Sequence, residues 1–165
     1  MTLVVAVVAV VVLLASYVTW TAGRLDRQHA RVDAAWAALD AQLVRRAAAS
    51  RALVPLLPPG PEAGRLDAAT SAAVEAGVVG REQVENDLTA ALRAAVPLLA
   101  AGAPVAELEV AGTRAWLARS FHNSAVKDAR TLRFRPLVRA LRLAGHRAMP
   151  LYFEVDDTAR TGSLP

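Results

Sequence analysis

The feature that most constrains this chain is a run without charged side chains, which extends from Leu3 to Ala22; the first charged side chain is that of Arg24. Twenty helical residues, each rising about 1.5 Å, span about 30 Å, which is the thickness of the hydrocarbon core of a bilayer. Tyr17 and Trp20 lie near the end of the run, where aromatic rings favour the membrane–water boundary. The run therefore predicts a transmembrane anchor over residues 1–23.

Two other interpretations of the run are a cleaved signal peptide and the buried core helix of a globular protein. A signal peptide begins with basic residues and has a shorter apolar stretch, whereas Met1 and Thr2 bring no basic side chain here. A helix at the surface of a globular core needs a polar face, and the consecutive valines at 10–12 leave none. We therefore favour the anchor and keep the cleaved signal as the alternative.

The rest of the chain has the composition of a helical domain. Of 165 residues, the roughly 140 that follow the anchor suffice for one domain. Apolar residues make up 55% of the chain and aromatic residues only 5%, which suits helices packed through small and aliphatic side chains better than a sheet. The absence of cysteine excludes disulfides, thiolate metal sites and cysteine nucleophiles.

Basic residues beside the anchor predict its orientation. Arg24, Arg27 and Arg31 follow the apolar run directly, and no basic side chain precedes it. Basic residues remain on the cytoplasmic side of a membrane. We therefore expect a single-pass protein of the plasma (inner) membrane, with its N-terminus outside and residues 24–165 in the cytoplasm.

A buried stripe runs along the segment after the anchor, at alternating steps of three and four residues: Leu25, His29, Val32, Trp36, Leu39 and Leu43. The spacing predicts a helix to about Val54, where Pro55 ends it, and this helix can continue directly from the anchor. Further helices are expected over 62–76, 81–96 and 105–132, separated by breaks rich in proline and glycine.

The expected fold class is all-α: an N-terminal transmembrane helix followed by an antiparallel up-and-down four-helix bundle. The expected domains are the anchor (1–23), the bundle (24–132), a basic amphipathic segment (133–157) and a disordered tail (158–165).

Three stretches resemble the LemA family of membrane-anchored helical proteins. Residues 31–46 are similar to the family pattern R-V-x-x-A-W-A-x-I-D-x-Q-L-x-R-R, residues 118–126 to A-R-x-x-Y-N-x-A-V, and residues 134–138 to F-P-x-N-L-V. The matching positions of the first two stretches include Arg31, Trp36, Asp40, Gln42, Leu43, Arg46, Arg119, Asn123 and Val126. His122 stands where the family has tyrosine, the usual I-P-N-L-V after the two arginines is absent, and residues 55–104 match nothing in the family.

This resemblance implies a single-pass membrane protein with a cytoplasmic antiparallel four-helix bundle. The family has no established enzymatic activity, so the resemblance supplies architecture and location without a mechanism.

Catalytic and metal-binding patterns are sparse. Asp26 and His29 form the only acid–histidine pair with the spacing of a di-iron bundle, and a packed histidine is the better interpretation. The stretch from Arg81 to Glu85 is faintly similar to part of a diphosphate-hydrolase helix, but the upstream glycine and glutamate are missing, so we expect an exposed helix start. Trp36 and Trp116 fall in helical stripes and are expected in the core rather than in a ligand platform. No catalytic residue, metal site or cofactor is predicted.

The leading functional hypothesis is a membrane-tethered helical scaffold or adaptor that binds other proteins near the membrane and is not an enzyme. The alternative is a membrane-associated hydrolase that uses an unrecognised carboxylate site. Nucleic-acid binding is disfavoured, because the basic segment lacks interleaved exposed aromatic residues and a recognised module.

The basic C-terminal segment suggests contact with anionic lipid through five arginines: Arg133, Arg135, Arg139, Arg142 and Arg147. An equally good interpretation is that Leu137, Val138 and Leu141 cap the bundle while the arginines stay solvated.

The spacing also predicts a register between the first and last helices of the bundle. If the two helices are antiparallel and Arg24 lies near the level of Leu132, Asn123 lies level with Trp36 and Arg119 with Asp40. Leu43 then lies level with Trp116. We expect an ion pair between Asp40 and Arg119 that fixes the register of the bundle. The alternative is that the residues brought together at this level form a binding site.

Overall fold

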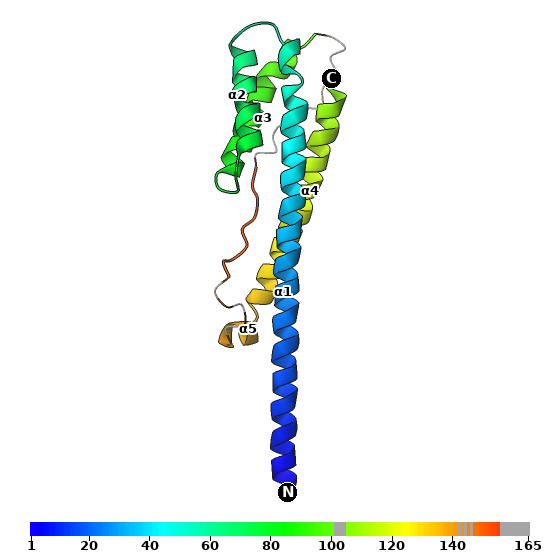
Figure 1. Ribbon diagram of the computed structural model, residues 1–165, viewed down its shortest axis with the longest axis vertical. Coiled ribbons are helices and arrows are strands. Elements are labelled where there is room, and N and C mark those ends of the chain that lie inside the picture. Colours follow the sequence, from blue (N-terminus) through cyan, green and yellow to red (C-terminus); the bar gives the residue numbers. More distant parts are fainter. Residues whose placement is uncertain (101–104, 142, 144, 146, 156–165) are drawn as a thin grey trace. The chain divides into compact units, whose positions relative to one another are not determined.

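The computed structural model describes residues 1–100, 105–141, 143, 145 and 147–155. Its regular secondary structure is helical, without a strand among the described residues (Figure 1). The elements in chain order are α1 (Thr2–Arg51), the 3-10 helix η1 (Val54–Leu56), α2 (Pro61–Glu75), α3 (Arg81–Ala95), the 3-10 helix η2 (Val96–Leu98), α4 (Ala106–Arg133) and α5 (Pro136–Ala140). The all-α prediction is confirmed, and the four long helices begin and end within a few residues of the expected positions. The predicted tail, 158–165, lies outside the described residues.

Helix α1 is continuous through the apolar run and beyond it. One window of 18 residues in this helix has a mean hydropathy of 2.6 and no buried residue, which makes it long and apolar enough to cross a membrane. A core helix of a globular protein would be mostly buried, so that interpretation does not fit. A signal sequence near an N-terminus passes the same test of length and composition, so cleavage is what distinguishes it from an anchor.

The described contacts divide the chain into two compact units, each with segments from distant parts of the sequence. The first, which we call the anchor unit, comprises residues 1–36 and 121–152. The second, the hairpin unit, comprises residues 37–120 and 153–165. Helices α1 and α4 each contribute residues to both units.

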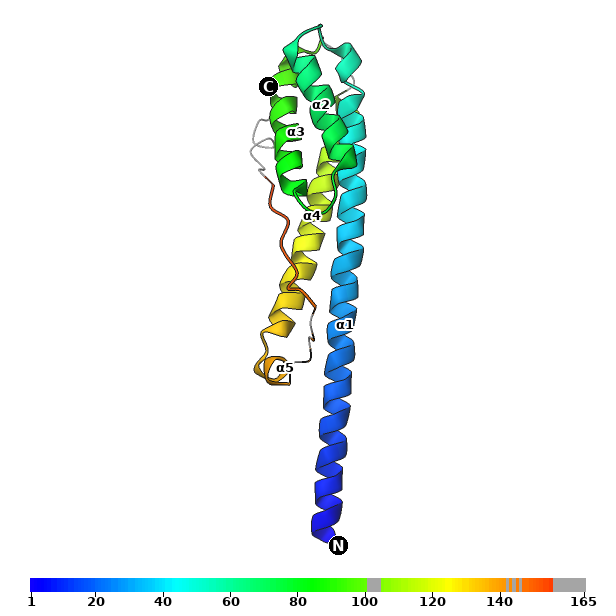
Figure 2. The ribbon, with the colours of Figure 1, turned by 60° about the vertical axis from the view of Figure 1, so that its left-hand side comes forward.

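Helices α2 and α3 form the hairpin of the second unit. They pack side by side and are joined by a short turn, as both views of the ribbon show (Figures 1 and 2). Gly80, the last residue of this turn, has φ of 78°, a left-handed conformation that favours glycine. Pro61 begins α2 at a position where its missing N–H costs nothing.

The core of the hairpin unit is aliphatic. Its fully buried members include Leu53 from the end of α1, Leu66 from α2, and Leu88 and Ala91 from α3. Leu108 of α4 is partly buried against the same cluster. These contacts bury the apolar stripes that the sequence shows on each helix.

The core of the anchor unit consists of one cluster of valine and alanine and another of leucine and valine. Leu25 of α1 shares a cluster with Leu132 of α4, and farther along α1 Val32 packs with Val126. As residue numbers rise along α1 they fall along α4, so the two segments run in opposite directions here. The edge-to-face contact of Trp36 and His122, with ring centroids 5.4 Å apart, continues the series. These contacts join residues whose numbers differ by little from the pairs that the predicted register gives.

The basic segment is only partly as predicted. Among the described residues between 134 and 147, regular helix is confined to α5. Val138 is buried with Leu25 and Leu132, but Leu137 and Leu141 are 52% and 50% exposed, so the expectation that all three apolar residues cap a core is wrong. Pro136 explains the interruption, because proline disfavours helical geometry in the residue before it.

Candidate functional site

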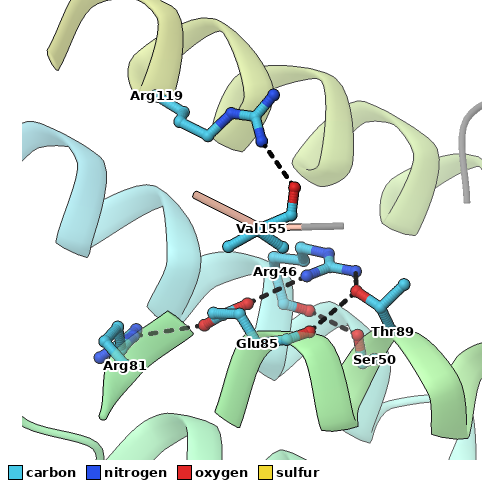
Figure 3. A network of polar contacts seen from close by, with 7 residues as sticks. All are labelled: Arg46, Ser50, Arg81, Glu85, Thr89, Arg119 and Val155. Atoms are coloured by element: carbon cyan, nitrogen blue, oxygen red, sulfur yellow. Dashed lines mark hydrogen bonds and ion pairs between the residues drawn. The ribbon is translucent and has the colours of Figure 1, made fainter. Parts of the chain in front are cut away.

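A buried cluster of charged side chains lies inside the hairpin unit, between α1 and α3 (Figure 3). Arg46 of α1 donates from Nη1 to Glu85 Oε2 at 2.9 Å and from Nη2 to Thr89 Oγ1 at 2.9 Å. The Thr89 hydroxyl in turn donates to the carbonyl of Glu85 at 2.8 Å. The carboxylate and the hydroxyl are one turn apart on α3, so one guanidinium can contact both.

Arg81, at the start of α3, completes the cluster. Its Nε donates to Glu85 Oε1 at 3.3 Å, and its Nη1 lies 3.0 Å from Asp40 Oδ1 and 2.8 Å from the carbonyl oxygen of Ala76. The Arg81 side chain is only 1% exposed, and its Nη2 is buried without a hydrogen-bond partner in the described part of the chain. Two guanidinium groups and two carboxylates therefore balance in charge at this site.

Burial dominates the acid–base behaviour of Glu85. Removal of the carboxylate from water raises the pKa of Glu85 above its usual range, while the charges of Arg46 and Arg81 act in the opposite direction. The Glu85 side chain is fully buried, so a substrate has no direct access to it. The arrangement is suited to fixing α3 against α1, since the loss of Glu85 would leave the buried guanidinium groups of Arg46 and Arg81 without their shared partner.

One expectation about these residues is wrong. Arg81 and Glu85 do not form an exposed helix start; both are buried, and within residues 81–85 only Glu82 and Gln83 are exposed. The carboxylate of Asp40 pairs with Arg81. The Arg119 guanidinium donates to the carbonyl of Val155 at 3.0 Å (Figure 3).

The signal that could have revealed Arg81 and Glu85 is their spacing. Positions 81, 85, 88, 92 and 95 are all buried, and they follow the alternation of three and four residues that marks one face of a helix. Charged residues at the first two positions of an apolar stripe point to an internal ion pair rather than to a solvated helix end.

The other residues singled out by the family resemblance are distributed over both units. Leu43 and Val126 are buried, and Trp36 is half-buried against His122. Gln42 is partly buried and its Oε1 has no hydrogen-bond partner among the described residues, while Asn123 is also partly buried. Arg31 forms an exposed ion pair with Asp128, with 3.6 Å between the charged atoms.

Trp116 differs from expectation, because it is 39% exposed rather than enclosed in a core.

His122 and His29 have distinct buried environments in the anchor unit. The Nε2 of His122 donates to the carbonyl of Leu151 at 3.3 Å, and its Nδ1 is buried without a partner among the residues that the structure describes. Burial lowers the pKa of His122. His29 donates from Nδ1 to the carbonyl of Leu25 at 2.9 Å, so it is the packed histidine that its stripe position predicts.

The arginines of the basic segment divide into engaged and exposed side chains. Arg133 donates to the carbonyl of Ala148 at 2.8 Å and lies 3.5 Å from Nε2 of His29. Arg135, Arg139 and Arg147 are exposed. Arg142 lies outside the described residues. Within the described part of the chain, no three His, Asp or Glu side chains are placed to hold a metal ion.

Comparisons of this chain with protein-family models, with curated proteins and with solved structures find no match.

Proposed function

We propose that this protein is a membrane-tethered helical scaffold or adaptor with the LemA-like architecture that its sequence motifs suggest: a single membrane span followed by an antiparallel four-helix bundle in the cytoplasm. The observation that carries this proposal is the enclosure of the buried charge cluster. Its central carboxylate, Glu85, is paired with two arginines and fully buried, which favours a structural role over a catalytic one.

The remaining acids also favour a scaffold over the hydrolase alternative. Acidic side chains outside the cluster, such as those of Asp33, Asp87, Glu107 and Asp128, are exposed. A hydrolase that uses carboxylates needs at least two of them directed into one enclosed site. Scattered, solvated acids are typical of a protein surface.

Exposed apolar side chains at the α2–α3 turn suggest where a protein partner binds. Val74, Val78 and Val79 are 43%, 68% and 96% exposed. An apolar group at the tip of a helical hairpin is a common feature of interaction surfaces. We therefore place the partner contact of the proposed adaptor at this turn.

Crosslinking in native membranes followed by purification of the tagged full chain tests the adaptor role. Partners should be enriched with the wild type and reduced with the Val78→Ser/Val79→Ser variant. Val110→Ser, at a valine of α4 that is 49% exposed, is the control and should leave the partners in place. Equal recovery with all three proteins would contradict the placement at the turn, and no enriched partner at all would contradict the adaptor role.

A reporter that is active only outside the membrane tests the proposed orientation. Fused after Pro165 it should be silent, because Arg24, Arg27 and Arg31 hold the adjoining side of the span in the cytoplasm. An active reporter at this position would show that the C-terminus lies outside, which would contradict the proposed orientation.

A further inference from the structure

A pocket of about 180 Å³ opens in the anchor unit where the apolar run of α1 ends. Its α1 wall is formed by Tyr17, Trp20, Thr21 and Arg24, and its other wall by the end of α4 and the start of α5, including Leu132 and Arg135. The volume is well above the roughly 10–15 Å³ that a single water molecule needs. The pocket is therefore large enough for a small polar group with an apolar attachment.

The polar groups of the pocket are suited to an anion. Arg24 and Arg135 both line it, and no acidic residue does. The Arg24 guanidinium lies over the Trp20 ring, 5.6 Å from its centroid, which orients the charge.

The Thr21 hydroxyl provides a second, independent indication of a ligand. Thr21 is only 4% exposed, lines the pocket, and its Oγ1 has no hydrogen-bond partner among the described residues. A threonine in a helix usually satisfies its hydroxyl on the carbonyl one turn earlier, as Thr19 does with Ala15 at 3.0 Å. Because an unsatisfied buried hydroxyl is costly, a bound acceptor oxygen would relieve Thr21.

The position of the pocket along α1 favours a lipid over a soluble anion. Arg24 carries the first charged side chain of the chain, directly after the apolar run, and so lies where a spanning helix enters the headgroup layer. Tyr17 and Trp20, whose ring centroids are 6.4 Å apart, mark the same boundary. A ligand in this pocket meets headgroups on one side and acyl chains on the other.

We propose that this pocket binds the phosphate group of one anionic phospholipid, with Thr21 donating to a phosphate oxygen, Arg24 and Arg135 balancing its charge, and the acyl chains lying along the exposed apolar face of α1. This inference rests on the membrane span of the proposed function. It goes beyond a diffuse attraction between the basic segment and anionic lipid, because it assigns a single site with named donors.

Native mass spectrometry of the full chain in detergent, loaded with equal amounts of phosphatidylglycerol and phosphatidylcholine, tests the site. The wild type should retain one phosphatidylglycerol preferentially. Arg24→Gln/Arg135→Gln should reduce this retention about tenfold, since each basic residue near an anionic headgroup contributes several-fold. Arg27→Gln/Arg139→Gln removes the same charge from exposed positions outside the pocket and should change retention less than about threefold.

The hydroxyl gives a test that does not alter charge. Thr21→Val should lower phosphatidylglycerol retention several-fold, whereas Thr19→Val, at an exposed threonine two residues away, should not. Equal losses in the two arginine double variants, or no difference between the two threonine variants, would overturn the site in favour of diffuse attraction. Arg24→Lys/Arg135→Lys, which keeps the charge, should recover part of the retention and shows that the pocket still folds.

Inorganic phosphate distinguishes a lipid from a soluble anion. Millimolar phosphate should leave the retained lipid in place, because it lacks the apolar contact. Displacement of the lipid by phosphate would assign the pocket to a free anion and overturn the lipid proposal. Sedimentation of each variant with membranes is measured separately. A protein that does not insert into the membrane fails to sediment, whereas a protein that lacks only the lipid site sediments but does not retain phosphatidylglycerol.

Discussion

In the hairpin unit, the buried Glu85 carboxylate pairs with two arginines, whereas two arginines of the anchor unit bind backbone carbonyl groups of the C-terminal segment. Arg46 and Arg81 both bind the buried Glu85. Arg130 and Arg133 instead donate to the carbonyls of Pro150 and Ala148. The difference shows two ways to use arginine: a paired guanidinium fixes two helices in one register, and a guanidinium on carbonyls fastens a segment that has no regular structure of its own.

The two units also differ in the size of the apolar side chains in their cores. Leucines from α1, α2 and α3 form the core of the hairpin unit, while valine and alanine form much of the core between α1 and α4 in the anchor unit. Larger side chains bury more apolar area and contribute more to stability. We therefore expect the hairpin unit to respond more strongly to substitution than the anchor unit.

The largest expected effect is that of Glu85→Ala. Removal of this carboxylate takes away the acidic partner that Arg46 and Arg81 share inside the protein. It should lower the free energy of unfolding by about 3–5 kcal/mol. Asp87→Ala, which removes an exposed carboxylate from the same helix, should cost less than about 1 kcal/mol. Denaturant titration of the full chain in detergent measures both. A Glu85 variant as stable as the Asp87 variant would show that the cluster does not hold the unit together.

The next prediction compares the stability that is lost when one core side chain of each unit is shortened. Leu88→Ala, at a fully buried leucine of the hairpin unit, should cost about 2–5 kcal/mol through lost contacts and a cavity. Val126→Ala, at a fully buried valine of the anchor unit, should cost about 1–2 kcal/mol because a smaller side chain is removed. A larger loss for the Val126 variant would reverse the comparison between the units.

Acid should weaken the anchor unit through His122. Because burial lowers its pKa, the unfolded chain binds a proton more readily than the folded one. The contribution of His122 to stability is therefore complete above its ordinary pKa, near 6.5, and is lost as the pH falls below that value. Protonation would also place a buried N–H at Nδ1 without a partner.

His122→Tyr should flatten this part of the pH dependence while keeping a ring against Trp36. Thermal unfolding followed at pH 5 to 8 measures the slope. Phe121→Tyr, at an exposed neighbour, is the control and should keep the slope of the wild type. An unchanged slope in the His122 variant would assign the acid sensitivity to other groups.

The smallest effect tests the partner of Asp40. Its side chain is 45% exposed, so Asp40→Asn should cost no more than about 1 kcal/mol. Because Asp40 pairs with Arg81, the combination of Asp40→Asn with Arg119→Gln should be additive within about 0.5 kcal/mol. A larger coupling energy, measured by a double-mutant cycle, would indicate a direct interaction between Asp40 and Arg119.

The helices could be predicted from sequence because their bounds and buried faces depend on local signals. Proline and glycine mark where helices end, and the three–four spacing from Leu25 to Trp36 defines which face is buried. The partner of Asp40 could not be predicted in this way. It depends on where α3 packs, and nothing in the spacing of α1 and α4 contains the position of Arg81.

The contacts of the C-terminal segment were missed for a different reason. Residues 147–155 are held largely through their backbone carbonyls, including those of Ala148, Leu151 and Val155. Every residue has a carbonyl, so such an acceptor leaves no mark in the sequence. The pocket beside Thr21 was missed because its two walls are more than a hundred residues apart in the chain.

That separation has a consequence for the order in which the protein is made. The α2–α3 hairpin joins residues close in sequence, and its contacts can form as soon as α3 has been synthesised. The pocket needs Thr21 and Arg135 together, so the ribosome has completed the hairpin before the second wall exists. The proposed lipid would therefore bind only after α4 has been synthesised, and its binding would report that α1 and the end of α4 have come together.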